Sequence, residues 1–269
     1  MLFRSSLGVL SMIYLYDGSF EGALSAIYQM FHDKGPMADQ SLHIRERYQY
    51  QIFEAVVETY PDEAKASKVA CSILDTFGPE TFRKIGYAYL SEDDVFGTKL
   101  YRFLKRAYKL GANAMDNLSD PDILEIYKCY NAVARESHRM IGFIRFAELE
   151  ERVFYAQFEP TYDLLSLVVP HFVDRLADQV WVIHDTKRRK AAFYNKETVH
   201  FSDLDPVESL YFSSVEKVYQ QMWKAYFDHI AIDERKNPKR HQQLMPKKYW
   251  NFLTEKRSEE RRVGKECRS

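Results

Sequence analysis

The sequence predicts an α+β protein with a helical N-terminal half, a central antiparallel sheet ordered strand-strand-helix-strand-strand, and C-terminal helices. Apolar residues recur every three or four positions through most of residues 12–139, as in amphipathic helices. Residues 140–205 contain short runs that alternate apolar and polar residues, as in strands. Helical spacing returns over residues 206–256, so we expect a single domain spanning residues 12–256.

The N-terminal half begins with a predicted short strand at residues 13–16, which is followed by a turn at Asp17-Gly18. A first helix is expected from Phe20 onward. Four further helix starts are indicated by capping residues or first-turn prolines, at Tyr60-Pro61-Asp62, Gly78-Pro79, Asp94 and Asp120-Pro121. Gly111 fits the C-terminal cap of the helix that follows Asp94, and the last of these helices is expected to end near His138.

The sheet half begins where the pattern changes, at Met140. Two hairpins are expected, with strands at residues 141–146 and 153–158, and at 180–184 and 190–194. A helix over residues 163–177 separates them, and Pro170 should kink or restart it. Residues 198–201 predict a further short strand.

The C-terminal part is expected to be helical from Pro206 to about Arg235. A broad apolar stripe at helical spacing predicts that this helix packs against another part of the protein. Asn237-Pro238 ends the pattern, and Met245-Pro246 starts a last helix.

The composition is that of a globular protein, with 46% apolar residues, 29% charged residues and a net charge of −1. The sequence has no apolar run long enough to span a membrane, so we expect no membrane association. Apart from Cys267 near the C-terminus, the cysteines are Cys71 and Cys129, which are too few for a disulfide framework or a zinc site. We therefore expect a cytoplasmic protein without a cofactor.

Both ends of the chain are expected to lie outside the fold. Residues 257–269 look like a translated sequencing-library adapter, an artefact to be excluded from fold reasoning. Residues 1–11 precede Met12, which opens the first strand and is the expected start. A signal peptide is the alternative, but the segment lacks a cleavage site of small residues.

The clearest electrostatic feature is the segment 235–250, which is rich in lysine and arginine and has no acidic residue. Lysine and arginine neutralise phosphates, and exposed aromatic rings stack on bases. The alternative, weighted equally, is a solvated basic loop whose tryptophan anchors the last helix. The candidate nucleic-acid-binding residues in this segment are Arg235, Lys236, Arg240, Lys247, Lys248, Tyr249 and Trp250.

A second candidate site lies around His171 and Arg175. If a helix restarts at Pro170, His171 lies in its first turn, where free N–H groups attract anions. Arg175 is one turn further along, so both side chains can reach one phosphate. The plainer interpretation, which spacing favours, is a capping histidine and an arginine paired with Asp174 or Asp178.

Asp185 is a candidate catalytic residue in addition to His171, because it follows His184 at the end of a strand and precedes an arginine-rich turn. Adjacent strand residues point to opposite faces, so His184 and Asp185 are not expected to pair with each other. Asp185 is expected instead to pair with Arg188 across the turn, in a structural role. Arg188 is also a candidate phosphate contact.

A third basic cluster, of Arg135, His138, Arg139 and Arg145, lies where the helical half meets the sheet half, and His138, Arg139 and Arg145 are its candidate nucleic-acid-binding residues. The alternative is that Glu136 neutralises this cluster. The sequence has no phosphate-binding glycine loop and none of the HExxH, CxxC, GxSxG or EF-hand patterns. Their absence argues against nucleotide hydrolysis, zinc proteolysis and serine hydrolysis.

Five segments resemble a bacterial family described as DNA metabolism or DNA repair proteins: MIYLYDGSFEG, HRMIGFIRF, EPTYDLL with PHFVDRL, QVWVIHDTKRRKAAFY, and WKAYFDHIAIDERKNPKRHQQLMPKKYW. The similarity covers residues 12–256. The family's domain also occurs fused to uracil-DNA-glycosylase-like domains, and free-standing members are encoded beside a radical-SAM protein. The resemblance implies DNA as the ligand and a radical-SAM protein as a partner, and it supplies no catalytic residues.

Three hypotheses follow for the function. The first is a DNA-binding accessory protein in bacterial DNA repair or DNA metabolism that works with a radical-SAM partner. The second is an enzyme that processes damaged DNA, similar to a glycosylase or nuclease, with His171 or Asp185 in acid–base roles. The third is a protein–protein adaptor that uses its aromatic surface.

Overall fold

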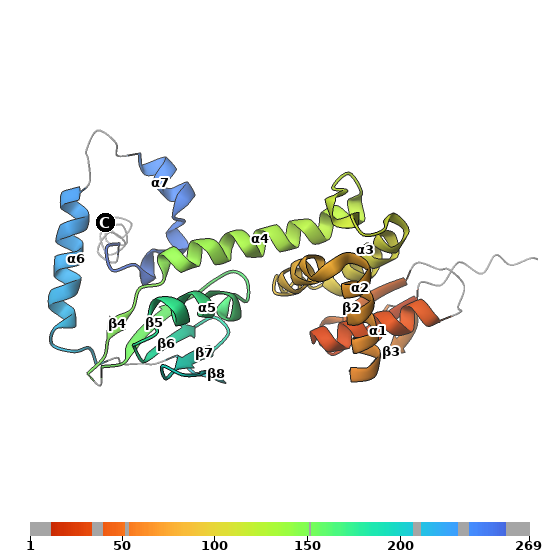
Figure 1. Ribbon diagram of the computed structural model, residues 1–269, viewed down its shortest axis with the longest axis horizontal. Helices are drawn as coiled ribbons and strands as arrows, with labels where there is room; N and C mark the ends of the chain where they lie inside the picture. Colours follow the sequence, from red (N-terminus) through yellow and green to blue (C-terminus); the bar gives the residue numbers. More distant parts are fainter. Residues whose placement is uncertain are drawn as a thin grey trace, which may run out of the picture. The chain divides into compact units, whose positions relative to one another are not determined.

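The computed structural model describes residues 12–33, 40–51, 54–150, 152–206, 211–230 and 237–256 (Figure 1). The predictions for the two chain ends, and for Arg235 and Lys236, fall outside these residues. The chain divides into two compact units, Met1–Ala134 and Arg135–Ser269, referred to below as unit 1 and unit 2. Each unit combines helices with a sheet, so the predicted α+β class is confirmed.

Unit 1 contains a three-stranded parallel sheet with β1 (Met12–Tyr16) at its centre, between β2 (Gln40–Ile44) and β3 (Ala55–Glu58). All residues of β1 after the first are buried, as expected for a parallel strand that is covered on both faces. The turn into α1 (Phe20–His32) passes through Gly18, whose φ of +87° is a conformation that glycine adopts without strain.

The helices of unit 1 begin and end close to the predicted positions. α2 (Glu63–Tyr89) is capped by Asp62 and kinks at Gly78, where φ is +80°, immediately before a proline. α3 (Phe96–Leu110) ends at a glycine, as predicted. α4 (Pro121–Phe143) starts at its proline. Capping residues and helix breakers therefore located most helix boundaries correctly.

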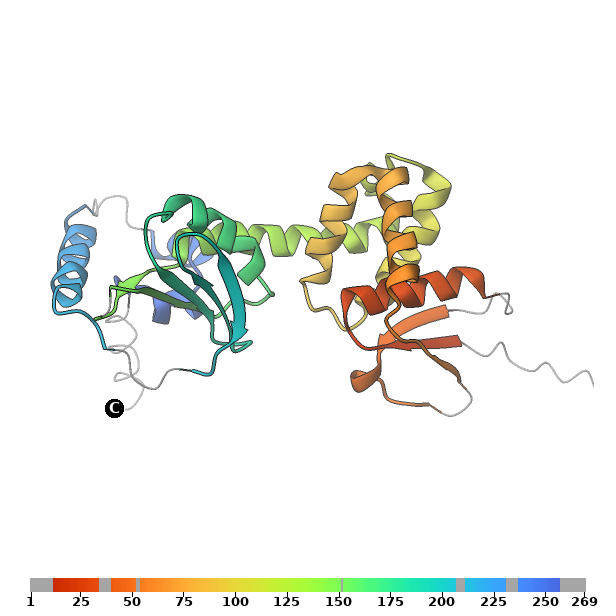
Figure 2. The same cartoon turned by 60° about the horizontal axis from the view of Figure 1, so that its bottom comes forward.

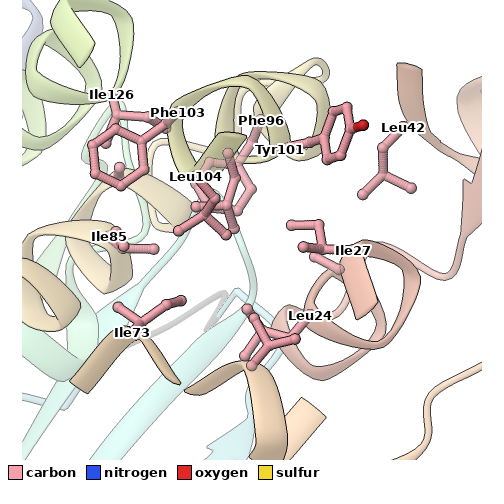
Figure 3. Packing of buried hydrophobic residues seen from close by; sticks show 14 of the residues in the cluster. Leu24, Ile27, Leu42, Ile73, Ile85, Phe96, Tyr101, Phe103, Leu104 and Ile126 are labelled. Carbon is pink, nitrogen blue, oxygen red and sulfur yellow. The ribbon is translucent and has the colours of Figure 1, made fainter. Parts of the chain in front are cut away.

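The core of unit 1 lies between the sheet and these helices, with two short 3-10 helices, η1 (Arg45–Arg47) and η2 (Ala114–Asp116), in the connections. α3 packs closely on β2 because Gly97 has no side chain: a Cβ there would lie 2.7 Å from the Leu42 side chain. The labelled core residues are Leu24, Ile27, Leu42, Ile73, Ile85, Phe96, Tyr101, Phe103, Leu104 and Ile126 (Figure 3).

Unit 2 contains a five-stranded sheet in which consecutive strands are neighbours (Figure 2). The predicted second hairpin and the strand after it are confirmed, since β6, β7 and β8 pair antiparallel. In order across the sheet the strands are β4 (Ala147–Glu148), β5 (Phe154–Phe158), β6 (Trp181–Asp185), β7 (Lys190–Tyr194) and β8 (Val199–Asp203).

The sheet is mixed and not purely antiparallel, so this part of the prediction was wrong. β5 and β6 run parallel, with Phe154 opposite Trp181. The chain leaves β5, forms α5 (Leu165–Arg175) and returns to the start of β6. A helical crossover of this kind joins parallel strands, whereas an antiparallel pair needs only a turn. α5 packs against β6 and β7.

The predicted strand at residues 141–146 was also wrong, because α4 continues to Phe143 and β4 contains only two residues. The buried positions Val133, Glu136, Met140 and Ile144 keep helical spacing through this stretch. The alternation of apolar and polar residues in this stretch therefore does not indicate a strand, because the stretch contains the end of a helix.

The C-terminal part of unit 2 consists of α6 (Glu216–Ile230), α7 (Pro238–Leu244) and the 3-10 helix η4 (Lys247–Phe252). α6 begins ten residues later than predicted, where Ser213 Oγ accepts the Glu216 N–H at 3.1 Å. η4 packs beside β5.

Every helix within the described ranges is too short or too polar to cross a bilayer.

Candidate functional site

The carboxylate of Glu136, in the last third of α4, is only 5% exposed and accepts hydrogen bonds from several parts of unit 2. It accepts the N–H of Thr161 at 3.0 Å, the Thr161 hydroxyl at 2.6 Å and the N–H of Tyr162 at 3.1 Å. Lys248 Nζ lies 3.2 Å from it, and the Tyr249 hydroxyl donates to it. Five donors from two segments, residues 161–162 and 248–249, therefore converge on one buried carboxylate.

The surroundings of Glu136 keep this carboxylate ionised. Burial raises the pKa of Glu136, but the hydrogen bonds from Thr161, Tyr249 and Tyr162 lower it by more, so its pKa lies below the ordinary value. A carboxylate that is ionised and saturated with donors is poorly suited to donate or accept a proton. Its role is to position the groups bound to it.

Thr161 is the point at which these segments meet. Its carbonyl oxygen accepts Lys187 Nζ at 2.8 Å and Arg188 Nη2 at 2.9 Å, both from the β6–β7 turn. Its hydroxyl is a partner of Lys248 Nζ, from the start of η4. The name Thr161 junction is used below for the group formed by Glu136, Thr161, Lys187, Arg188, Lys248 and Tyr249.

Asp185 holds the turn that carries Lys187 and Arg188. Its carboxylate accepts the two backbone N–H groups of these residues at 3.1 and 3.2 Å and pairs with Arg188 Nη1 at 3.0 Å. The predicted structural pairing of Asp185 with Arg188 is therefore confirmed. Burial raises the pKa of Asp185, and the interactions with Arg188 offset this only in part. Asp185 has no exposed surface, so it has no direct access to a substrate.

Arg188 is committed to the interior of unit 2, since its side chain is only 8% exposed. Besides Asp185 and Thr161, it reaches the carbonyl oxygen of Pro160 at 3.4 Å. Lys187 and Arg189 of the same turn are exposed, and Arg189 pairs with exposed Asp205.

His184 has partners of its own, as the alternation of strand side chains predicts. Its Nε2 lies 3.1 Å from the carbonyl oxygen of Leu204, and its Nδ1 lies 2.7 Å from the Tyr155 hydroxyl. A carbonyl can only accept, so Nε2 carries the hydrogen and Nδ1 accepts from Tyr155. Burial lowers the pKa of His184, which favours this neutral form. The ring is a structural link between β5, β6 and the segment after β8.

The two aromatic residues predicted to stack on bases are buried instead. Tyr249 is 3% exposed and Trp250 is 9% exposed, with the indole N–H donated to the Met245 carbonyl oxygen at 3.0 Å. A ring enclosed by protein cannot stack on a base. The stacking interpretation of these two residues was therefore wrong, and the alternative in which Trp250 anchors the C-terminal segment agrees with the structure.

The exposed cations next to the Thr161 junction come from α4 and η4. His138 and Arg139 are exposed on α4, on the turn that also carries buried Glu136. Arg139 lies close enough to Tyr249 to oppose the rise in its pKa, which burial and the bond to Glu136 cause. Lys247 is exposed, and the Lys248 side chain is 52% exposed despite its ion pair.

Arg145 does not join this surface. Its Nη2 pairs at 2.9 Å with the buried carboxylate of Glu255, and its Nη1 donates to the Gly142 carbonyl oxygen at 2.6 Å. The guanidinium also lies over the Trp223 ring, 5.9 Å from its centre. Arg145 therefore ties the end of α4 to the C-terminal segment.

The helix-terminus interpretation of His171 was wrong. α5 begins at Leu165 and continues through Pro170, so half-buried His171 lies in its second turn, where backbone N–H groups are already bonded. Proline has no N–H, so the hydrogen bond that residue 170 would donate within the helix is missing, but the helix continues without it. Arg175 is the exposed last residue of α5. Arg240 is exposed on α7.

Unit 1 has a cavity of about 510 Å³ lined by residues of β2, α3 and α4. Lys99 of this lining is ion-paired, with its Nζ 2.7 Å from Asp93 and 3.1 Å from Glu125. In the parts of the chain that the structure describes, no group of three or more histidine, cysteine or acidic side chains is arranged to hold a metal ion.

Comparison with known families places these features in context. Residues 96–255 match the family described as a domain of unknown function, DUF4130. This match covers more than half of the chain. The chain belongs to the DUF4130 family. The whole Thr161 junction lies within the DUF4130 match, as do all strands of unit 2. No curated protein matches the chain.

Two central residues of this DUF4130 site were missed at the sequence level. Glu136 was considered only as a neutralising charge for the basic cluster, and Thr161 was not considered, although it lies in the EPTYDLL segment. The sequence contained one signal: Glu136 is an acidic residue among cations, and helical spacing places it on the same face as the apolar residues Val133 and Met140. A carboxylate at such a position requires donors from elsewhere in the fold.

Proposed function

We propose that this DUF4130 protein binds DNA through backbone phosphates at the Thr161 junction, as an accessory protein in bacterial DNA repair or DNA metabolism that works with a radical-SAM protein. The observation that carries the proposal is that Lys187 and Lys248, from distant segments, are both held on Thr161 while their side chains remain exposed. Two cations fixed on one residue form a preorganised phosphate contact, because their side chains are already ordered.

The charge balance around the junction supports an anionic ligand. Two acidic groups, Glu136 and Asp185, are buried and hydrogen-bonded to several donors. Asp163 acts on Asp185 through its charge, and Asp203 and Asp205 line a pocket together with Arg188. The hydrogen-bond donors around Glu136 and Asp185 therefore offset the repulsion between these two carboxylates and a bound phosphate. The cationic side chains are Arg139, Lys187, Arg188 and Lys248, with His138 and Lys247 exposed nearby in sequence.

The sequence resemblance to DNA metabolism and DNA repair proteins supports DNA as the polyanion, and it supports the radical-SAM protein as the partner. The enzymatic alternative receives less support from the geometry. Asp185 is enclosed, and His171 does not occupy a helix terminus. We therefore propose binding and not catalysis as the function of this surface.

The proposal is tested by fluorescence anisotropy with labelled duplex DNA. The double variant Lys187→Ala/Lys248→Ala should bind at least about tenfold more weakly than wild type, since each lost phosphate contact weakens binding in proportion to the ions it displaces. The matched control is Lys190→Ala/Lys217→Ala, which removes two exposed lysines of unit 2 outside the junction. Equal losses in both double variants, or no binding by wild type at low salt, would refute the proposal.

A further inference from the structure

The helix α6 is attached to unit 2 by its polar side. Glu216 is 8% exposed, and its carboxylate accepts the Glu148 N–H at 3.0 Å and the Gln220 amide at 2.7 Å. Two turns after Glu216, the Trp223 indole N–H donates to the buried carboxylate of Glu255 at 3.1 Å. These polar contacts fix which side of the helix faces the rest of unit 2.

The apolar stripe of α6 faces solvent as a result. Its exposed residues, together with Val215 immediately before the helix, follow helical spacing: Val215 (49% exposed), Val218 (53%), Tyr219 (60%), Met222 (60%) and Tyr226 (58%). Amphipathic helices normally bury such a stripe and expose their polar side. The predicted packing of this stripe against another part of the protein is thus not found among the described residues.

The size of the stripe is that of an interface. Five large side chains, each about half exposed, present roughly 500 Å² of mostly apolar surface, which is near the upper limit for monomeric proteins. Burying such an area stabilises an association at about 25 cal/mol per Å², before the cost of ordering the partners. A contiguous patch of this size therefore points to a binding partner.

The chemistry of the stripe distinguishes between partners. Around the helix axis, Lys217 lies about half a turn from Val215, and Lys224 lies about half a turn from Met222. No lysine of α6 therefore flanks the stripe to contact phosphates. Trp223 and Tyr226 stack on each other, with ring centres 5.8 Å apart. They therefore do not form separate platforms on which bases could stack. The stripe is thus apolar and uncharged, which disfavours DNA and any partner recognised by charge.

We propose that α6 is the interface through which two copies of this chain form a dimer. An uncharged stripe is complementary to itself, and a two-fold axis between Tyr219 and Met222 sets the helices antiparallel, with Val215 of each copy near Tyr226 of the other. The two stripes together bury roughly 1,000 Å², at the lower limit for a specific interface. The dimer is therefore a weak one that forms reversibly at micromolar concentrations.

Sedimentation velocity of the full chain from about 1 to 100 µM tests this proposal. The wild type should move from monomer to dimer over this range and no further, and Met222→Glu should remain monomeric throughout. Tyr219→Glu should do the same. Gln221→Glu adds the same charge at an exposed position on another side of α6 and should dimerise like the wild type.

Circular dichroism of each variant checks that folding is unchanged, as expected for exposed positions. A wild type that is monomeric at every concentration would overturn the proposal, and the stripe would then belong to a different protein partner. Dimerisation that survives both Met222→Glu and Tyr219→Glu, or growth beyond the dimer, would overturn it as well.

Discussion

Lys248 Nζ lies 3.2 Å from the buried carboxylate of Glu136, although 112 residues separate them along the chain. This pair joins the start of η4 to the last third of α4. Thr161 bonds to both partners, so the exposed lysine is held by a carboxylate and a hydroxyl at once. The geometry of the proposed phosphate contact therefore depends on a residue that does not itself face solvent.

Replacing Glu136 by Gln should destabilise the protein by about 2–4 kcal/mol, because donors that now share a buried carboxylate would lose charge-assisted bonds. Urea denaturation measures the change. Glu159→Gln is the matched control, since Glu159 is exposed and should change stability by less than about 0.5 kcal/mol. Similar effects for the two variants would contradict the assigned role of Glu136.

The lowered pKa of Glu136 also predicts a pH dependence. Because the folded state favours the ionised form, the stabilisation is fully present above the pKa of the unfolded chain, about 4.3, and is lost as pH falls through the folded value. The stability difference between wild type and Glu136→Gln should therefore shrink below about pH 4. A difference that is constant between pH 7 and pH 3 would show that ionisation of Glu136 contributes nothing.

Arg188→Gln should destabilise the protein by about 3–5 kcal/mol, because it leaves Asp185 buried without its cation. Arg189→Gln is the control, since the Arg189 side chain is 68% exposed and pairs with exposed Asp205. Thermal unfolding followed by circular dichroism compares the two. If Arg188→Gln were as stable as the control, Arg188 would not be the internal partner that the contacts indicate.

His184 should remain neutral, with its hydrogen on Nε2, at pH values where an ordinary histidine is protonated. Its pKa is lowered by burial, so the folded protein should lose stability as pH falls below about 6.5, where the unfolded chain takes up the proton. Nitrogen chemical shifts of the labelled imidazole report both tautomer and titration. Protonation of this ring near pH 6.5 in the folded protein would contradict the assignment.

The sequence predicted the features that depend on neighbouring residues. Asp62 and Gly111 were located as caps because their effects act within one helical turn. The end of α4 was not predicted, because the residues around Phe143 alternate as in a strand although α4 continues to Phe143 and its buried positions face the core of unit 2. Local patterns carry no information about such contacts.

The candidate site was predicted only in part, for the same reason. Asp185 and Arg188 are three residues apart, and their pairing followed from turn geometry. The bond from Lys248 to Thr161 spans 87 residues, so no spacing rule connects the two. The burial of Trp250 was likewise undetermined, since a basic aromatic segment has the same pattern whether its rings face solvent or the core.

The central claim is that Lys187 and Lys248 contact phosphates, and the salt dependence of DNA binding tests it most directly. Between about 50 and 200 mM salt, the slope of log affinity against log salt should be less steep by about 1.8 in Lys187→Ala/Lys248→Ala than in wild type. This value corresponds to the loss of one phosphate contact for each lysine. The control Lys190→Ala/Lys217→Ala should keep the wild-type slope. A slope unchanged by loss of both junction lysines would contradict the claim.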